Sequence, residues 1–209
     1  MKLFLNALTK FIAGLLLVAL LLFLPAGTIR YPGGLLFLCL LFVPMLLLGI
    51  LMLARARDLL AKRLDVKEKQ GTQKGVVAVM GLIFLSGFIL AGLDFRFGWS
   101  KVPLPVVIVA SVLFLVGYAL YAEVMRENAY LSRTIKVEEG QTVISTGLYA
   151  VVRHPMYTAS TVMFLALPLI LGSWYALIPF ALYKALFNLS KDSLYFFFKF
   201  LELFLIFGY

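Results

Sequence analysis

The sequence predicts an all-α integral membrane protein, a bundle of about five to six transmembrane helices that includes a short C-terminal helical hairpin. Its composition and several apolar runs of spanning length predict this class. Hydrophobic residues make up 63% of the 209-residue chain, charged residues only 14%, and the mean hydropathy is +1.03. A chain of this size has too little interior to hide so much apolar surface from water. The composition therefore excludes a soluble globular enzyme, a disordered protein and a disulfide scaffold.

Four apolar runs are long enough for a helix to cross the hydrocarbon core of a bilayer, which takes about 20 residues. The runs are rich in Leu, Val and Phe and lack the strict alternation of a barrel strand. They cover residues 4–26, 34–54, 76–93 and 103–125. A cleaved signal peptide is the alternative for the first run, but Leu24-Pro25-Ala26-Gly27 fits a cleavage site poorly and favours a retained helix.

Residues 158–189 form a further apolar stretch, interrupted by Pro168, Gly172-Ser173 and Pro179. One straight helix of this length would measure about 48 Å, against a hydrocarbon core of about 30 Å. We therefore expect two short legs that turn at Gly172-Ser173 and return the chain to the side from which it came. A single kinked span is the alternative.

Basic residues are distributed unequally between the two sides of the expected bundle. The N-terminal segment holds two, the 53–75 loop seven and the 126–157 segment four, which makes thirteen against three on the other side, Arg30, Arg96 and Lys101. The positive-inside rule then places the N-terminus, the 53–75 loop and the 126–157 segment in the cytoplasm. Topology and attraction to anionic lipid headgroups explain the net charge of +9, so no nucleic-acid partner is expected.

Residues 126–157 form the long segment that is dense in polar groups, and they hold the single histidine, His154. Pro155 follows where a new helix should begin, a position that tolerates proline because its missing N–H would be unpaired anyway. The start of such a helix offers free N–H groups and a partial positive charge to a carboxylate or phosphate. Arg153 and Tyr157 add a cation and an aromatic hydroxyl at the same point. An ordinary solvated connector is the alternative interpretation.

Part of this segment, residues 140–157, reads GQTVISTGLYAVVRHPMY. It resembles the signature of the isoprenylcysteine carboxyl methyltransferase family of integral membrane enzymes, and phospholipid N-methyltransferases share a related pattern. The core of the resemblance is Arg-His-Pro-x-Tyr preceded by Gly-x-Tyr, placed after several transmembrane helices and before a helical hairpin. The resemblance covers about residues 126–183, so the chain divides into four helices (1–125), a cofactor segment with the hairpin (126–189) and an atypical tail (190–209).

The resemblance implies that S-adenosylmethionine binds at the cytoplasmic membrane boundary and that a lipid-like acceptor arrives from the bilayer. Tyr149 and Tyr157 suit the sulfonium or the purine of this cofactor, and the helix start with His154 suits its carboxylate. Arg153 and Gly147 are supporting candidates. Methyl transfer is an in-line displacement that needs no metal, and the lone Cys39 offers no cysteine metal site. The cofactor contacts that the resemblance implies are Gln141, Thr142, Val143, Ile144, Tyr149, His154, Pro155, Met156 and Tyr157.

The chain departs from the family pattern after the hairpin. The family usually carries an arginine and then paired glutamates that contact substrate and cofactor, whereas this chain has a Phe-rich tail in which Glu202 is the one acid after Asp192. We interpret the tail as a replaced domain end, as a frameshift or rearrangement would produce. Loss of the counter-charge for the cofactor's amine predicts impaired activity. The apolar-rich residues 194–207 are short for a span and fit an interfacial helix.

Two other functions are compatible with parts of the pattern. A sterol-type membrane reductase that uses NADPH has a similar His-Pro-x-Tyr helix start, but it typically has Asn in place of Met156 and an acidic residue soon after the tyrosine. A non-catalytic membrane protein is the third alternative. The acceptor stays open between a prenylated cysteine carboxylate, a lipid amine and a small isoprenoid. Among the acids, Glu138-Glu139 fits an exposed turn, and Glu123 is expected to pair with Arg126.

Overall fold

The computed structural model describes residues 2–55, 74–127, 146–152 and 155–182, and every regular element among them is helical. The first four helices coincide with the four apolar runs, because a continuous apolar segment in lipid satisfies its backbone groups as a helix. The all-α class is thus confirmed for this part of the chain. The helices are α1 (Lys2–Ala26), α2 (Pro32–Arg55), α4 (Lys74–Phe97), α5 (Leu104–Glu127), α6 (Leu148–Val151) and α7 (Pro155–Ile170).

Three segments within the described helices are long and apolar enough to cross a membrane: Leu3–Ala26, Pro32–Arg55 and Leu104–Val124. A shorter apolar helix covers Thr158–Ile170 in α7. These helices support an integral membrane protein. The expected number of five to six spans is not confirmed, and a membrane-spanning role for α4 stays an expectation.

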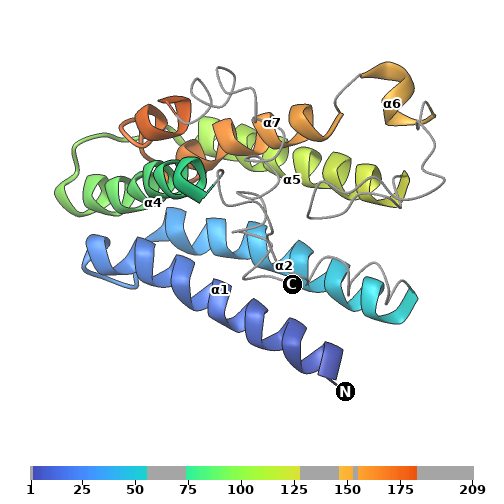
Figure 1. Ribbon diagram of the computed structural model, residues 1–209. Helices are drawn as coiled ribbons and strands as arrows, with labels where there is room; N and C mark the ends of the chain where they lie inside the picture. Colours follow the sequence, from blue (N-terminus) through green and yellow to red (C-terminus); the bar gives the residue numbers. More distant parts are fainter. Residues whose placement is uncertain (1, 56–73, 128–145, 153–154, 183–209) are drawn as a thin grey trace.

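The helices form a bundle in which α1 and α2 run antiparallel along one side, with α4, α5 and α7 on the other (Figure 1). The closest pairs along the bundle are α5 with α7 and α1 with α4. Three connections meet at one end, which we call the Asp94 end: the α1–α2 turn (27–31), the α4–α5 loop (98–103) and the turn after α7 (171–176). The opposite end, where α5 finishes and α6 lies, is called the Tyr149 end.

Asp94 in the last turn of α4 holds the connections of the Asp94 end together. Its side chain is buried, with 1% of its surface exposed. One carboxylate oxygen accepts a hydrogen bond from the Ser100 backbone N–H at 2.7 Å, and the other accepts from the hydroxyls of Ser100 and Ser173. The same two hydroxyls accept backbone N–H groups of Trp174 and Ala176, both at 3.1 Å. The carboxylate therefore joins α4, the loop before α5 and the turn after α7.

Tyr31 makes a second connection at the same end. Its ring is buried, stacks on Phe95 with 4.3 Å between ring centroids, and packs edge-on against Phe23 of α1. Its hydroxyl donates to the Leu171 carbonyl just after α7. Burial raises the pKa of the Tyr31 hydroxyl well above its usual range, so the group stays a donor at any physiological pH. The α1–α2 turn is thereby tied to the end of α7.

Small residues bring the helices of each close pair together. A Cβ added to Gly117 of α5 would lie 2.7 Å from Met163 Cγ of α7, and one added to Gly92 of α4 would lie 2.7 Å from the Leu22 carbonyl of α1. Such close approach is the usual way in which helices pack in membranes, where burial of apolar surface gives little driving force. Phenylalanines fill the space between the helix pairs, among them Phe37, Phe84, Phe88, Phe114, Phe164 and Phe180.

The chain reverses direction after α7. The helix ends at Ile170, Gly172 has φ +78°, and residues 177–182 are helical again. Phe180 on this second leg packs edge-on against Phe84 and Phe88 of α4, so the leg runs back from Asp94 along α4. As far as residue 182, this arrangement agrees with two legs joined at Gly172-Ser173 and differs from one kinked span.

Exposed aromatic side chains gather at the Asp94 end. Phe97 stacks on Trp99 with 5.4 Å between centroids, and Trp99 packs edge-on against Tyr175. The Trp174 indole donates to the Lys101 carbonyl at 3.2 Å. Both tryptophans of the chain therefore lie here, half exposed. Trp and Tyr are enriched at membrane–water interfaces, so this group of aromatic side chains is typical of a segment at a boundary of the bilayer.

We predict that Asp94→Ala destabilises the bundle by about 1–3 kcal/mol, because it leaves the donors of Ser100 and Ser173 without their buried acceptor. Thermal unfolding of the purified protein in detergent, followed by circular dichroism, measures the change. Ser86→Ala is the control, since the exposed Ser86 hydroxyl donates to the Ile83 carbonyl of its own helix. Equal transition temperatures for Asp94→Ala and Ser86→Ala would contradict the role assigned to Asp94.

Candidate functional site

The described part of the signature begins with a turn at Gly147 and the single-turn helix α6 at the Tyr149 end (Figure 1). Gly147 has φ +55° and ψ −127°, a backbone conformation that is open to glycine and strained for other residues. The turn is closed by backbone hydrogen bonds from Tyr149 to Thr146 at 3.1 Å and from Val152 to Leu148 at 3.0 Å. The positive φ of Gly147 therefore explains why the Gly-x-Tyr pattern has a glycine at this position.

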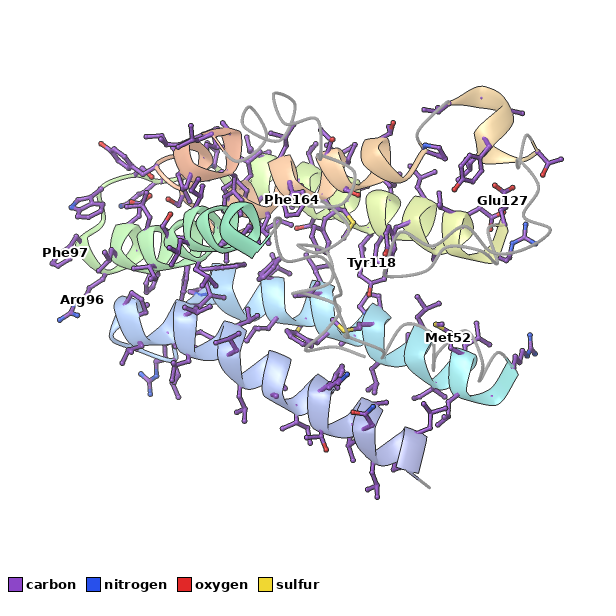
Figure 2. All side chains as sticks on the ribbon, in the orientation of Figure 1. Met52, Arg96, Phe97, Tyr118, Glu127 and Phe164 are labelled. Carbon is purple, nitrogen blue, oxygen red and sulfur yellow. The ribbon has the colours of Figure 1, made fainter. Side chains whose placement is uncertain are left out.

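Glu127 at the end of α5 contacts this turn directly. Its carboxylate accepts a hydrogen bond from the Leu148 backbone N–H at 3.0 Å. A Cβ placed on Gly147 would overlap the same carboxylate. Figure 2 shows Glu127 at the Tyr149 end, beside α6 and far from Arg96 and Phe97. The carboxylate thus links the end of α5 to the first N–H of α6, 21 residues later in the chain.

The sequence reasoning did not single out Glu127 as a site residue. Its position as the last residue of α5, at the beginning of the polar segment 126–157, was the available signal. That signal is weak, because an acid at the end of a helix is most often a solvated surface group.

Tyr149 lies half-buried in α6, and its ring packs against the hydrophobic core, as does Leu148. Its neighbours Ala150 and Val151 are exposed. Tyr149 is therefore held at the margin of the core, where one part of the ring contacts the protein and another is accessible.

Helix α7 begins at Pro155, as the sequence predicts, and Pro155 itself is buried. Met156 and Tyr157 belong to the first turn of α7, but the described residues do not include their side chains. Arg153 and His154, and the extended piece at Gln141, Thr142, Val143 and Ile144, lie outside the described residues. The structure thus brings together Gly147, Tyr149 and Glu127, and it leaves the other site assignments as predictions.

The expected pairing of Glu123 with Arg126 is confirmed. The two side chains form a bidentate interaction, with nitrogen–oxygen distances of 2.5 and 2.8 Å. The hydrogen bond to Glu123 raises the pKa of Arg126. Both groups are engaged with each other on the surface of α5, which agrees with a structural rather than a catalytic role for Glu123.

Over the described ranges, no group of three or more His, Cys, Asp or Glu side chains gathers in a way that would hold a metal ion. The absence of a metal from the reaction stays an expectation, since the histidine and much of the polar segment lie outside those ranges.

Comparison with known proteins identifies the part of the chain to which this site belongs. Residues 105–192 match the family model of the phospholipid methyltransferases (PEMT). No curated protein and no solved structure matches the chain. The matched residues run from the first turn of α5 through α6, α7 and the turn that follows, and they include the whole signature. The match does not support the alternative of a sterol-type reductase. Residues 105–192 are therefore similar to a phospholipid methyltransferase domain, which confirms that this part of the chain resembles the membrane methyltransferases.

Proposed function

We propose that this protein is an integral membrane methyltransferase that transfers a methyl group from S-adenosylmethionine to a lipid-like acceptor at the Tyr149 end. The match of residues 105–192 to the phospholipid methyltransferase family is the observation that carries the proposal. Membrane methyltransferases of this kind typically use S-adenosylmethionine, and the family name favours a phospholipid amine as the acceptor. A prenylated cysteine carboxylate or a small isoprenoid remains open as the acceptor.

The depth of the site supports a reaction between a water-soluble donor and a membrane-bound acceptor. The apolar part of α5, Leu104–Val124, is 21 residues long, which corresponds to about 31 Å of helix and about the thickness of the hydrocarbon core. With Trp99 and Trp174 at one boundary, the other boundary falls where α5 reaches Glu127 and the turn of α6. The signature is therefore expected at the membrane surface, where both reactants have access.

The residues at this surface fit the cofactor chemically. The compact turn at Gly147 allows backbone and carboxylate groups to approach closely, and Tyr149 offers an aromatic face at the edge of the core. The first turn of α7, a helix of 16 residues, provides a partial positive charge beside Pro155 that suits the carboxylate of the cofactor. S-adenosylmethionine supplies an electrophilic methyl group, and its sulfur keeps the electron pair of the broken bond.

The protein's contribution is to hold donor and acceptor in line and away from bulk water, which accounts for much of the rate of such a displacement. We assign cofactor binding to Tyr149, His154, Met156 and Tyr157 around the start of α7. The backbone of the extended piece from Gln141 to Ile144 completes this assignment, with Arg153 in support.

We place the Tyr149 end in the cytoplasm. Thirteen basic residues lie in the segments on this side, against three at the Asp94 end. The positive-inside rule gives this orientation, and it exposes the site to the compartment that supplies the cofactor.

The Phe-rich tail bears on the activity of this particular chain. The family match ends at residue 192, and the arginine and paired glutamates expected after the hairpin are missing from the sequence. A cofactor amine without this counter-charge binds less tightly, so we expect lower activity than in relatives with the intact element.

Cofactor binding to the purified protein tests the proposed function. Labelled S-adenosylmethionine should bind and NADPH should not, whereas a reductase would bind NADPH and a non-catalytic protein neither. His154→Ala and Tyr157→Ala should each weaken binding of S-adenosylmethionine about tenfold, as expected for loss of a cation–π or charged contact. The control is Tyr175→Ala, which removes a half-exposed tyrosine at the Asp94 end. Unchanged affinity in both signature variants would refute the assigned site.

The turn at Gly147 provides a second test. Gly147→Ala should weaken binding of S-adenosylmethionine because an alanine is strained by about 1–3 kcal/mol at this φ and ψ and displaces the Glu127 carboxylate. Gly98→Ala is the matched control, since Gly98 also has a positive φ, +65°, but lies at the Asp94 end with open space around it. Equilibrium binding and thermal unfolding are measured for both variants. A loss of affinity as large in Gly98→Ala as in Gly147→Ala would show that the effect is one of general stability.

A further inference from the structure

A groove opens on the side of the bundle between α5 and α7, apart from the signature. Its volume is about 450 Å³, within the range of pockets that hold small molecules. Every residue that lines it is apolar, among them Pro105, Val109 and Leu113 of α5 and Val162, Leu165 and Leu169 of α7. Such a lining offers no hydrogen-bonding group and selects a hydrocarbon occupant.

The groove has the length and position of one leaflet. From Pro105 to Leu113 the helix rises about 12 Å, and from Val162 to Leu169 about 10 Å, against about 15 Å for half of the hydrocarbon core. Pro105 lies at the start of the apolar part of α5, and Leu113 lies near its middle. The groove therefore extends from the Asp94 end to the centre of the membrane, as an acyl chain of that leaflet does.

The surface at the mouth of the groove is suited to an anionic headgroup. Lys101 lies in the loop just before α5, four residues from Pro105, and its side chain is exposed. The exposed Arg30 and Arg96 lie at the same end. Of the acids that the structure describes, Asp94 alone is at this end, and it is buried among hydroxyls and a backbone N–H. Trp174, bonded to the Lys101 carbonyl, marks the level of the interface.

We propose that this groove is a binding site for an anionic glycerophospholipid of the leaflet at the Asp94 end, with one acyl chain between α5 and α7 and its phosphate at Lys101. The lipid is not the methyl acceptor, since the inner end of the groove at Leu113 is about 21 Å along α5 from Glu127. It stabilises the packing of α5 against α7 within the residues that match the methyltransferase family. The proposal does not depend on the methyl-transfer activity.

The site is tested by native mass spectrometry. The protein is released from detergent in the presence of phosphatidylglycerol or phosphatidylcholine, and the lipid that it retains is measured. Val109→Trp fills the groove and should remove most of the retained phosphatidylglycerol. Ile108→Trp is the matched control, because the adjacent Ile108 is equally exposed, 55% against 58% for Val109, but does not line the groove. Lys101→Gln should lower the preference for phosphatidylglycerol over phosphatidylcholine about fivefold, and Arg96→Gln should change it less.

A measurement on the unmodified protein does not depend on how the variants fold. Phosphatidylglycerol with a photoreactive diazirine in its acyl chain should crosslink to peptides covering residues 105–113 and 162–169 of the unmodified protein. Crosslinks confined to other helices would overturn the proposal, as would equal retention of lipid by Val109→Trp and Ile108→Trp. A change in the ratio of monomer to dimer in Val109→Trp, with lipid retention unaltered, would assign the groove to a second copy of the chain instead. Methylation of the retained lipid would identify it as the acceptor and would also overturn the proposal.

Discussion

The buried carboxylate of Asp94 is the interaction on which the arrangement of the bundle depends. Burial of an acid is costly unless its oxygens are hydrogen-bonded, and here donors from Ser100 and Ser173 supply those bonds. Since the donors come from the α4–α5 loop and from the turn after α7, the carboxylate fixes where α7 ends. The Tyr31 hydroxyl, bonded to the Leu171 carbonyl, fixes the same point from the α1–α2 turn.

Because α7 is fixed at its Ile170 end, it also determines where its other end, at Pro155, lies. Helix α7 packs along α5 at Gly117, and its 16 residues run from Pro155 at its start to Ile170 at the anchored end. The start of α7 at Pro155 is therefore held in place because the opposite end of α7 is anchored and its side packs against α5. Glu127 completes this arrangement by joining the end of α5 to α6. The two ends of the bundle thus differ: hydrogen bonds at the Asp94 end connect three segments of the fold, and the Tyr149 end holds the turn at Gly147 and the start of α7.

What the sequence could predict was local. The positions of the four long helices followed from continuous apolar runs, the start of α7 from the rule for proline at the first helical position, and the Glu123–Arg126 pair from their spacing of three residues. The contact of Asp94 with Ser173 joins residues 79 apart, and that of Tyr31 with Leu171 joins residues 140 apart. No spacing rule brings such residues together, because their contact depends on how whole helices pack. For the same reason, the sequence did not predict the contact of Glu127 with Leu148, 21 residues away, or the groove that α5 and α7 form together.

The boundary of the family match is not a structural boundary. Residues 105–192 contain the signature, but the turn at 171–173 within them is held by Asp94 of α4 and by Tyr31, which both precede the match. A cut at residue 105 would leave the Ser173 hydroxyl and the Leu171 carbonyl without these partners, and it would expose Phe180 by removing the rings that it contacts on α4. Buried polar groups that lose their partners destabilise the part of the fold that holds them. The helices that precede the family match are therefore a structural part of the same fold, because they position α7 and the start of that helix at Pro155.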